Sequence, residues 1–281
     1  FWERDLGSNG KTYLTPKYIF SEEMKNPQNK HLYDEKAKAH AYQMVNDFKG
    51  VVDEWDVVNE ILGHTKVKDV FGPQIYKDAF QWAREAGGED MTLYYNEVSI
   101  HEKVFLEKLD ELVAMGVDFD AIGLQSHYDA HRIATPSVIL TLYDNLRKYG
   151  KELKVTEFSA SMSDKELQGS VMRDTMICTF AEEQMNGFLM WGFWDGANFE
   201  SNSPVYDKEW NLKPGGRAYV DLVYNKWWTR DAKATTDAEG KATVRGFYGD
   251  YDVTVTHNGI TKTVETAFHK GYNNTLEIVL E

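Results

Sequence analysis

The chain has 281 residues, 42% hydrophobic and 27% charged, and is long enough to bury a sizeable core. Its formal net charge of -14 at pH 7 argues against nucleic acid or an anionic membrane as a partner, because both attract clustered Lys and Arg, and it suits a neutral substrate. The single cysteine, Cys178, excludes a disulfide within the chain, and no run of 18 apolar residues predicts a membrane span.

Short apolar runs, each followed by a polar loop and a longer amphipathic stretch, repeat from residue 50 to about 230. A predicted helix precedes them, from about Glu35 to Phe48. The apolar runs predict strands at 54–60, 91–95, 120–125, 152–157 and 187–192. The amphipathic stretches predict helices at about 67–86, 100–115, 136–149, 164–185 and 215–226. The helix at 164–185 opens with a capping-box pattern, Ser163-Asp164-Lys165-Glu166.

Strands that alternate with helices predict parallel strands joined by crossover helices. A doubly wound sheet usually begins with a glycine-rich turn, which this chain lacks, whereas a (β/α)8 TIM barrel takes catalytic residues from the C-terminal ends of several strands. Such ends carry Glu60, Asn96, Gln125, Glu157 and Trp191. The sequence therefore predicts a (β/α)8 barrel.

Five complete strands and a stub at Phe1-Trp2 are visible, although a closed barrel needs eight. We therefore expect the N-terminal strands to be absent from this chain or supplied by another chain segment. Beyond Trp228 the pattern changes to alternation of apolar and polar residues, and Asn258-Gly259 is a strong hairpin signal. Four antiparallel strands are predicted there, at 241–247, 250–257, 260–268 and 275–280. The expected domains are a partial barrel, 1–230, and a small all-β module, 231–281.

Two glutamates lie on apolar strands: Glu60 ends Trp55-Asp56-Val57-Val58-Asn59-Glu60, and Glu157 lies in Lys154-Val155-Thr156-Glu157-Phe158. Carboxylates avoid buried strands because losing water is costly unless the charge is paired or hydrogen-bonded. Unrelated structural ion pairs are the alternative explanation. A pair of glutamates at one site is the usual means of cleaving a glycosidic bond.

Four motifs occur in the order and spacing of glycoside hydrolase family 10, which consists mainly of endo-β-1,4-xylanases. They are the segment ending in Glu60, Ile122-Gly123-Leu124-Gln125-Ser126-His127, Val155-Thr156-Glu157 and Met190-Trp191-Gly192-Phe193. The chain resembles that family over residues 1 to about 230. The segment 245–251 resembles part of a β-module that follows the barrel in one branch of the family, and Phe1-Trp2-Glu3 resembles the end of the third barrel strand.

The resemblance implies a retaining endo-β-1,4-xylanase in which Glu60 is the general acid/base and Glu157 the nucleophile. Retention requires a covalent glycosyl-enzyme intermediate and carboxyl groups about 5–5.5 Å apart. Glu60 must hold a proton near neutrality, and Glu157 must stay ionised, stabilised by neighbours such as His127 and Asn59. Two other functions stay open: a xylan-binding protein without turnover, and a retaining glycosidase acting on other β-glycans or on xylo-oligosaccharides.

The same resemblance implies the substrate-binding residues. Asn59 hydrogen-bonds the sugar 2-hydroxyl, while Gln125 and His127, two residues apart and so on one side of their strand, lie near the nucleophile. Asn96 is a further candidate near the catalytic centre.

Aromatic residues are expected to complete the sugar site. Trp191 floors the cleft, with core packing as the alternative. Trp2 is a weaker candidate because its strand is truncated, and Trp194 is a third aromatic that could stack on a sugar.

The sequence departs from the family in several places. Phe199 stands where a second Trp is usual, and Phe158-Ser159 stands where a hydrophobic residue and Asp are usual. The family's upstream lysine, asparagine and histidine would precede residue 1. His64 and His101 lack partners at metal-ligand spacing, so neither a metal nor a cofactor is expected. The resemblance implies a secreted or cell-surface protein whose partner is xylan or xylo-oligosaccharides.

Overall fold

The computed structural model describes residues 1, 3–4, 15–197, 202 and 205–280. Trp2 and Phe199, two positions singled out from the sequence, lie outside the described residues. The chain divides into two compact units, Phe1–Ala218 and Tyr219–Glu281. The domain boundary expected near residue 230 stays a prediction.

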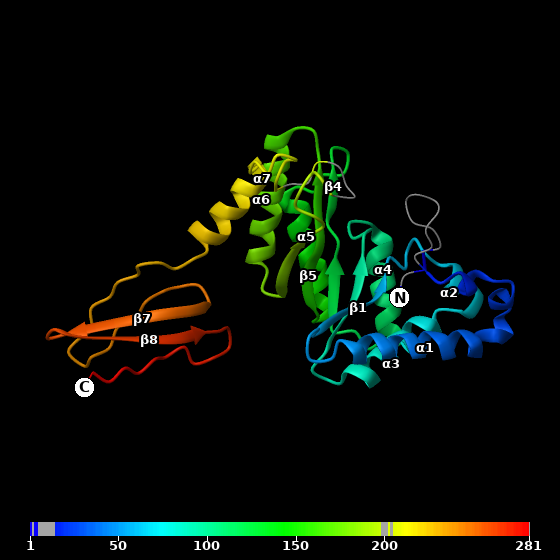
Figure 1. Cartoon of the computed structure of the whole chain (residues 1–281), viewed down its shortest axis with the longest axis horizontal. Coiled ribbons are helices and arrows are strands. Elements are labelled where there is room, and N and C mark those ends of the chain that lie inside the picture. Colours follow the sequence, from blue (N-terminus) through cyan, green and yellow to red (C-terminus); the bar gives the residue numbers. More distant parts are fainter. Residues whose placement is uncertain (2, 5–14, 198–201, 203–204, 281) are drawn as a thin grey trace. The chain divides into compact units, whose positions relative to one another are not determined.

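The first unit is built on parallel strands (Figure 1). They are β1 (Glu54–Asn59), β2 (Thr92–Glu97), β3 (Ala121–Leu124), β4 (His127–Asp129), β5 (Glu152–Ser161) and β6 (Met185–Met190). The pairing order is β1-β2-β3-β5, and both β4 and β6 also pair with β5. All five predicted strand positions are therefore occupied by strands. The third is interrupted before β4, where Ser126 has a left-handed backbone with φ of 59°.

The helices follow the predicted alternation, with different boundaries. They are α1 (Lys30–Asp47), α2 (Lys66–Phe71), α3 (Gln74–Gly87), α4 (Lys103–Ala114), α5 (Pro136–Leu146), α6 (Lys165–Ala181) and α7 (Pro214–Val220). Short 3-10 turns lie at Lys17–Phe20, Glu23–Lys25, Pro27–Asn29 and Arg147–Tyr149, and a π-helical turn at Asp221–Lys226.

Two local differences from the prediction have clear causes. The single helix expected at 67–86 is broken into α2 and α3, because Gly72 adopts φ of 82° and Pro73 follows it. The N-cap of α6 is Asp164, whose side chain accepts hydrogen bonds from the backbone N–H groups of Glu166 and Leu167, both at 3.0 Å. The predicted helix start is thus correct, but Asp164 caps it in place of Ser163.

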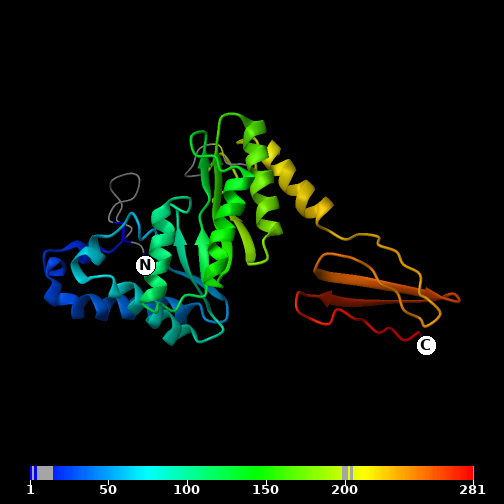
Figure 2. The ribbon, with the colours of Figure 1, turned by 180° about the vertical axis from the view of Figure 1, so that it is seen from behind.

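Helices cover the sheet through apolar residues at helical spacing. In α3 the buried side chains include Ile75, Ala79, Phe80 and Ala83, and this helix packs against β1 and β2. Helix α6 packs against β5 and β6 (Figure 2 shows the ribbon from behind). The fully buried strand residues hold the C-terminal strand ends in fixed positions. Within the described residues, no helix is long and apolar enough to cross a membrane.

The second unit contains one antiparallel hairpin, β7 (Gly249–His257) with β8 (Ile260–Phe268). Its turn is Asn258-Gly259, with φ of 49° and 83°, which confirms the hairpin predicted at this dipeptide. The predicted strands at 241–247 and 275–280 are wrong, because neither segment is a strand. Residues 241–247 are all exposed, so their alternation buries no apolar face that would favour pairing.

Candidate active site

The two glutamates lie at the C-terminal side of the sheet, but they differ in backbone position and conformation. Glu157 is inside the long strand β5, whereas Glu60 directly follows β1 in a left-handed conformation, with φ of 55°. Glu60 donates its backbone N–H to the carbonyl of Asn96 at 3.0 Å, which ties the end of β1 to β2. A non-glycine residue with positive φ is uncommon and costs free energy, so surrounding contacts must hold Glu60 there.

Three amide side chains connect the two carboxylates. Gln125 Nε2 donates to Glu60 Oε1 at 3.1 Å and to Asn59 Oδ1 at 3.0 Å. Asn96 Nδ2 donates to the same Asn59 oxygen at 3.0 Å and to Glu157 Oε1 at 2.7 Å. Five of the residues singled out from the sequence, on four strands or strand ends, thus form one continuous hydrogen-bonded network. Asn59 reaches Glu157 through Asn96, whereas a direct contact was expected from the sequence.

His127 lies on the other side of Glu157. Its Nε2 is 3.3 Å from Glu157 Oε2, and its Nδ1 is 2.8 Å from Ser159 Oγ. The ring of Trp191 approaches the His127 ring edge-to-face, with centroids 6.3 Å apart. Trp191 is 45% exposed, which disfavours core packing as its role.

Three neighbours of the network were missed from the sequence. His64, considered only as a metal ligand, places Nε2 3.1 Å from Glu60 Oε2. Thr156 donates its hydroxyl to Asn96 Oδ1 at 2.7 Å, and a Cβ on Gly123 would lie 2.4 Å from the same oxygen. The spacing of His64, four residues after Glu60 at the end of a strand, was the one available signal. Gly123 gave none, because its role depends on the strand beside it.

Glu97, the residue after Asn96, is fully buried and anchors the segment that follows Glu60. Its Oε2 accepts the backbone N–H of Leu62 at 3.2 Å and the hydroxyl of Tyr95 at 3.0 Å. Its Oε1 accepts the backbone N–H groups of Val98 at 2.8 Å and Ser99 at 3.3 Å. Burial raises the pKa of this carboxyl above its usual value.

The pKa of Asp56, on β1, depends in part on the charge of Glu157. Desolvation, and then the negative charge of Glu157, raise the pKa of the Asp56 carboxyl to about 6. The side chain as a whole is exposed, so the effect comes from atoms crowding the carboxyl group and not from burial of the whole residue.

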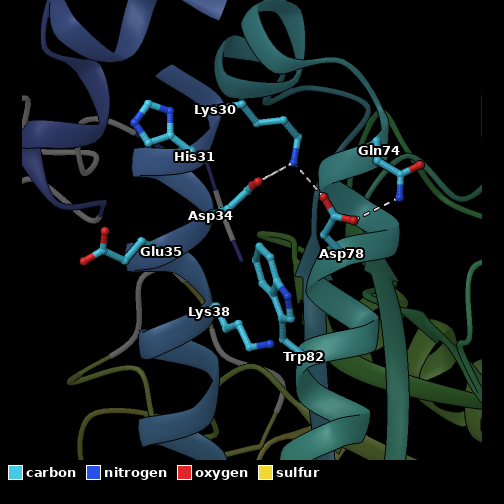
Figure 3. Close-up of a pocket in the computed structure, with 8 residues that line it drawn as sticks. All are labelled: Lys30, His31, Asp34, Glu35, Lys38, Gln74, Asp78 and Trp82. Atoms are coloured by element: carbon cyan, nitrogen blue, oxygen red, sulfur yellow. Dashed lines mark hydrogen bonds and ion pairs between the residues drawn. The ribbon is translucent and has the colours of Figure 1, made fainter. Parts of the chain in front are cut away.

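A separate hollow of about 590 Å³ lies between α1 and α3 (Figure 3). Several of its polar groups bind one another: Lys30 Nζ contacts Asp34 at 2.7 Å and Asp78 at 2.8 Å, and Gln74 donates to Asp78 at 2.9 Å. The catalytic and substrate-binding residues expected from the sequence are not among the residues that line it.

The profile of glycosyl hydrolase family 10 matches residues 12–222, which is most of the chain. The chain belongs to glycosyl hydrolase family 10. Members of this family have the (β/α)8 fold, and the parallel strands and flanking helices of the first unit agree with it.

The relatives of this chain include one protein named as an anti-sigma factor and others named as xylanases. It is 27% identical over 242 residues to the anti-sigma-I factor RsgI6 of Acetivibrio thermocellus, a match covering 83% of this chain and 30% of the relative. It is 28% identical over 247 residues to endo-1,4-beta-xylanase A of Caldicellulosiruptor saccharolyticus, covering 75% and 71%. The chain thus spans less than a third of the first relative's length.

Solved structures agree with the family assignment. Xylanase 10B from Thermotoga petrophila, determined in complex with xylobiose, has a TM-score of 0.61 and 25% identity, and the match covers 67% of this chain and 65% of that one.

Proposed function

We propose that the protein is a retaining endo-β-1,4-xylanase in which Glu60 is the general acid/base and Glu157 the nucleophile. The observation that supports this best is the continuous amide network between the two carboxylates. Asn96 and His127 flank Glu157 and suit an ionised carboxylate, while Gln125 and His64 flank Glu60. Two carboxylates in different environments match the division of labour that glycoside cleavage needs.

In the first step, Glu157 attacks the anomeric carbon of the sugar while Glu60 gives its proton to the leaving glycosidic oxygen. The C–O bond to the leaving sugar breaks, and a glycosyl ester on Glu157 forms. In the second step, the Glu60 carboxylate removes a proton from water as the water oxygen attacks the same carbon. Glu157 leaves as a carboxylate, and Glu60 is protonated again.

Neighbouring side chains have positioning roles in this scheme. Asn59, held by Asn96 and Gln125, is oriented to meet the sugar 2-hydroxyl, a contact that strengthens in the transition state. The exposed ring of Trp191 offers a face for the sugar ring. Trp2 remains a proposed sugar contact outside the described residues.

The proposal includes a chain segment that completes the barrel beside β6, whose Leu189 is exposed. Residues 1–230 then form the catalytic part and 231–281 an accessory module. The named xylanase relatives support xylan or xylo-oligosaccharides as the substrate. The secreted or cell-surface location implied by the family resemblance stays a prediction.

A second candidate is xylan binding without turnover, because one relative, the anti-sigma-I factor RsgI6, does not carry the name of an enzyme. The intact network around both glutamates favours catalysis.

The experiment compares Glu60→Ala with the unaltered full-length protein on xylan and on an aryl xyloside with a good leaving group. Xylan cleavage should fall by about 10²–10⁴-fold, whereas formation of the intermediate from the aryl xyloside should change little, because that leaving group needs no proton. Added azide should then accelerate turnover of the aryl xyloside. Equal loss on both substrates without azide rescue would remove the acid/base assignment, and binding without hydrolysis by the unaltered protein would favour the second candidate. Product analysis on xylan, mixed β-glucan and xylo-oligosaccharides identifies the preferred chain.

A further inference from the structure

The histidine beside Glu157 is held at both ring nitrogens by one strand. Glu157 and Ser159 are two residues apart on β5, so their side chains leave the same face of the sheet. His127, on the adjacent β4, pairs in register with Ser159. Its two nitrogens therefore reach the two side chains at once, at 3.3 Å to Glu157 and 2.8 Å to Ser159. Ser159 is only 2% exposed, so its hydroxyl is directed at the ring with little competition from water.

The chemistry of these groups determines where the protons lie. An ionised carboxylate only accepts hydrogen bonds, so the Nε2 that faces Glu157 must carry a proton. The Nδ1 atom then has either a lone pair, in neutral imidazole, or a second proton, in imidazolium. A hydroxyl can donate to the lone pair or accept from the second proton, so Ser159 permits the neutral ring and does not require the charged one. A carboxylate in the same place could only accept, and would require the second proton on His127.

We infer that Ser159 is a positioning residue that holds His127 as a neutral imidazole with its proton on Nε2, directed at Glu157. The effect on turnover rests on the proposed role of Glu157 as the nucleophile, whereas the inferred tautomer rests on the contacts among the three side chains. A neutral donor stabilises the ionised Glu157 less than a cation would, and so leaves the carboxylate more reactive toward the anomeric carbon.

Other titratable groups surround this arrangement. On β1, desolvation and then the negative charge of Glu157 raise the pKa of Asp56. Glu60 and His64, at the end of β1, form a second carboxylate–imidazole contact at 3.1 Å. From β2 the neutral Asn96 contacts Glu157, and from the end of β6 the uncharged Trp191 meets the His127 ring. The surrounding carboxylates thus favour a cation at His127, whereas Ser159, the uncharged group that contacts Nδ1, adds no negative charge there.

The test is nitrogen-15 NMR of the full-length protein labelled at histidine. At pH 7.5 the unaltered protein should show His127 with a protonated Nε2 and an unprotonated Nδ1. Ser159→Asp should make both nitrogens protonated and move the titration midpoint of His127 upward by about 1–3 pH units, as expected for a new negative charge in contact. The neutral isostere Ser159→Asn controls for size, and Ser159→Thr, which keeps the hydroxyl, should restore the original tautomer. An imidazolium or an Nδ1–H tautomer in the unaltered protein would overturn the inference, even where Ser159→Asp fails to fold.

A kinetic readout separates positioning from stability. At a pH between the His127 midpoints of the unaltered protein and of Ser159→Asp, this variant should have a lower kcat for an aryl xyloside and a nearly unchanged KM. The lost activity should return as the pH rises above the midpoint of the variant. Ser161→Asp, which adds the same charge two residues further along β5, should leave the His127 midpoint in place. An equal shift in both variants would refute a specific role for Ser159. If the expected tautomer is found in a protein that hydrolyses no xyloside, the proposed function fails and the inference about Ser159 stands.

Discussion

Replacing Glu97 by Gln tests how strongly one buried carboxylate supports the segment that carries Glu60. The wild-type carboxylate accepts four hydrogen bonds, two at each oxygen, and the side chain is 0% exposed. Gln keeps one acceptor oxygen and turns an NH2 group toward two donors. Each hydrogen bond to a charged group contributes about 1.5–3 kcal/mol, so losing two should lower the free energy of unfolding by about 3–6 kcal/mol.

Denaturant unfolding of the full-length protein measures this loss, with Glu107→Gln as the matched control. Glu107 is exposed and pairs only with Lys103 among its described contacts, so its replacement should change stability by less than about 0.5 kcal/mol. Because Leu62 is two residues from Glu60, kcat for xylo-oligosaccharides should also fall in Glu97→Gln. A stability change as small as that of the control would show that the four hydrogen bonds do not hold this segment.

Three further predictions concern other parts of the chain. Gly123→Ala places a Cβ 2.4 Å from Asn96 Oδ1 and should lower kcat/KM by about 10-fold or more, because it displaces the amide network. The control Gly63→Ala, whose Cβ has open space around it, should leave kcat/KM unchanged. Equal kcat/KM in the two variants would contradict this prediction. Burial raises the pKa of Glu3 to about 7 from its usual 4.5, so its stabilising contribution is complete below pH 4.5 and is lost as the pH rises through 7. The unfolding free energy of the unaltered protein should therefore fall by about 3 kcal/mol relative to that of Glu3→Gln between pH 4 and 8. If the two proteins show parallel curves of unfolding free energy against pH, this contribution of Glu3 is excluded. Deleting residues 231–281 should keep xyloside turnover while lowering stability; loss of turnover in a deletion variant that remains folded would assign this module a catalytic part.

The strands were predictable because each is an apolar run whose side chains are buried in the sheet. The interruption between β3 and β4 was not, since nothing in the sequence marks Ser126 as left-handed. In the second unit, alternation alone predicted four strands and only the pair closed by Asn258-Gly259 forms. Alternation is a reliable signal only where one face of a strand is buried against neighbours.

The network residues at the strand ends were predictable from their motifs, but their partners were not. From the sequence, Ser159 was notable only because an Asp is usual at its position in the family. The contact of its hydroxyl with His127 depends on the register of β4 against β5. The anchoring role of Glu97 depends on Leu62, 35 residues away. Such roles arise from pairing between distant segments, which a single sequence does not specify.

Trapping the covalent intermediate tests the central claim most directly. A 2-fluoro xylobioside with a good leaving group should inactivate the full-length protein, because fluorine slows both steps and the leaving group lets the first proceed, so the glycosyl ester accumulates. Mass spectrometry of the digested protein should then find one 2-fluoroxylobiosyl group on the peptide containing Glu157, and Glu157→Gln should remain unlabelled. A label on Glu60, or xylan turnover that continues in Glu157→Gln, would contradict the account.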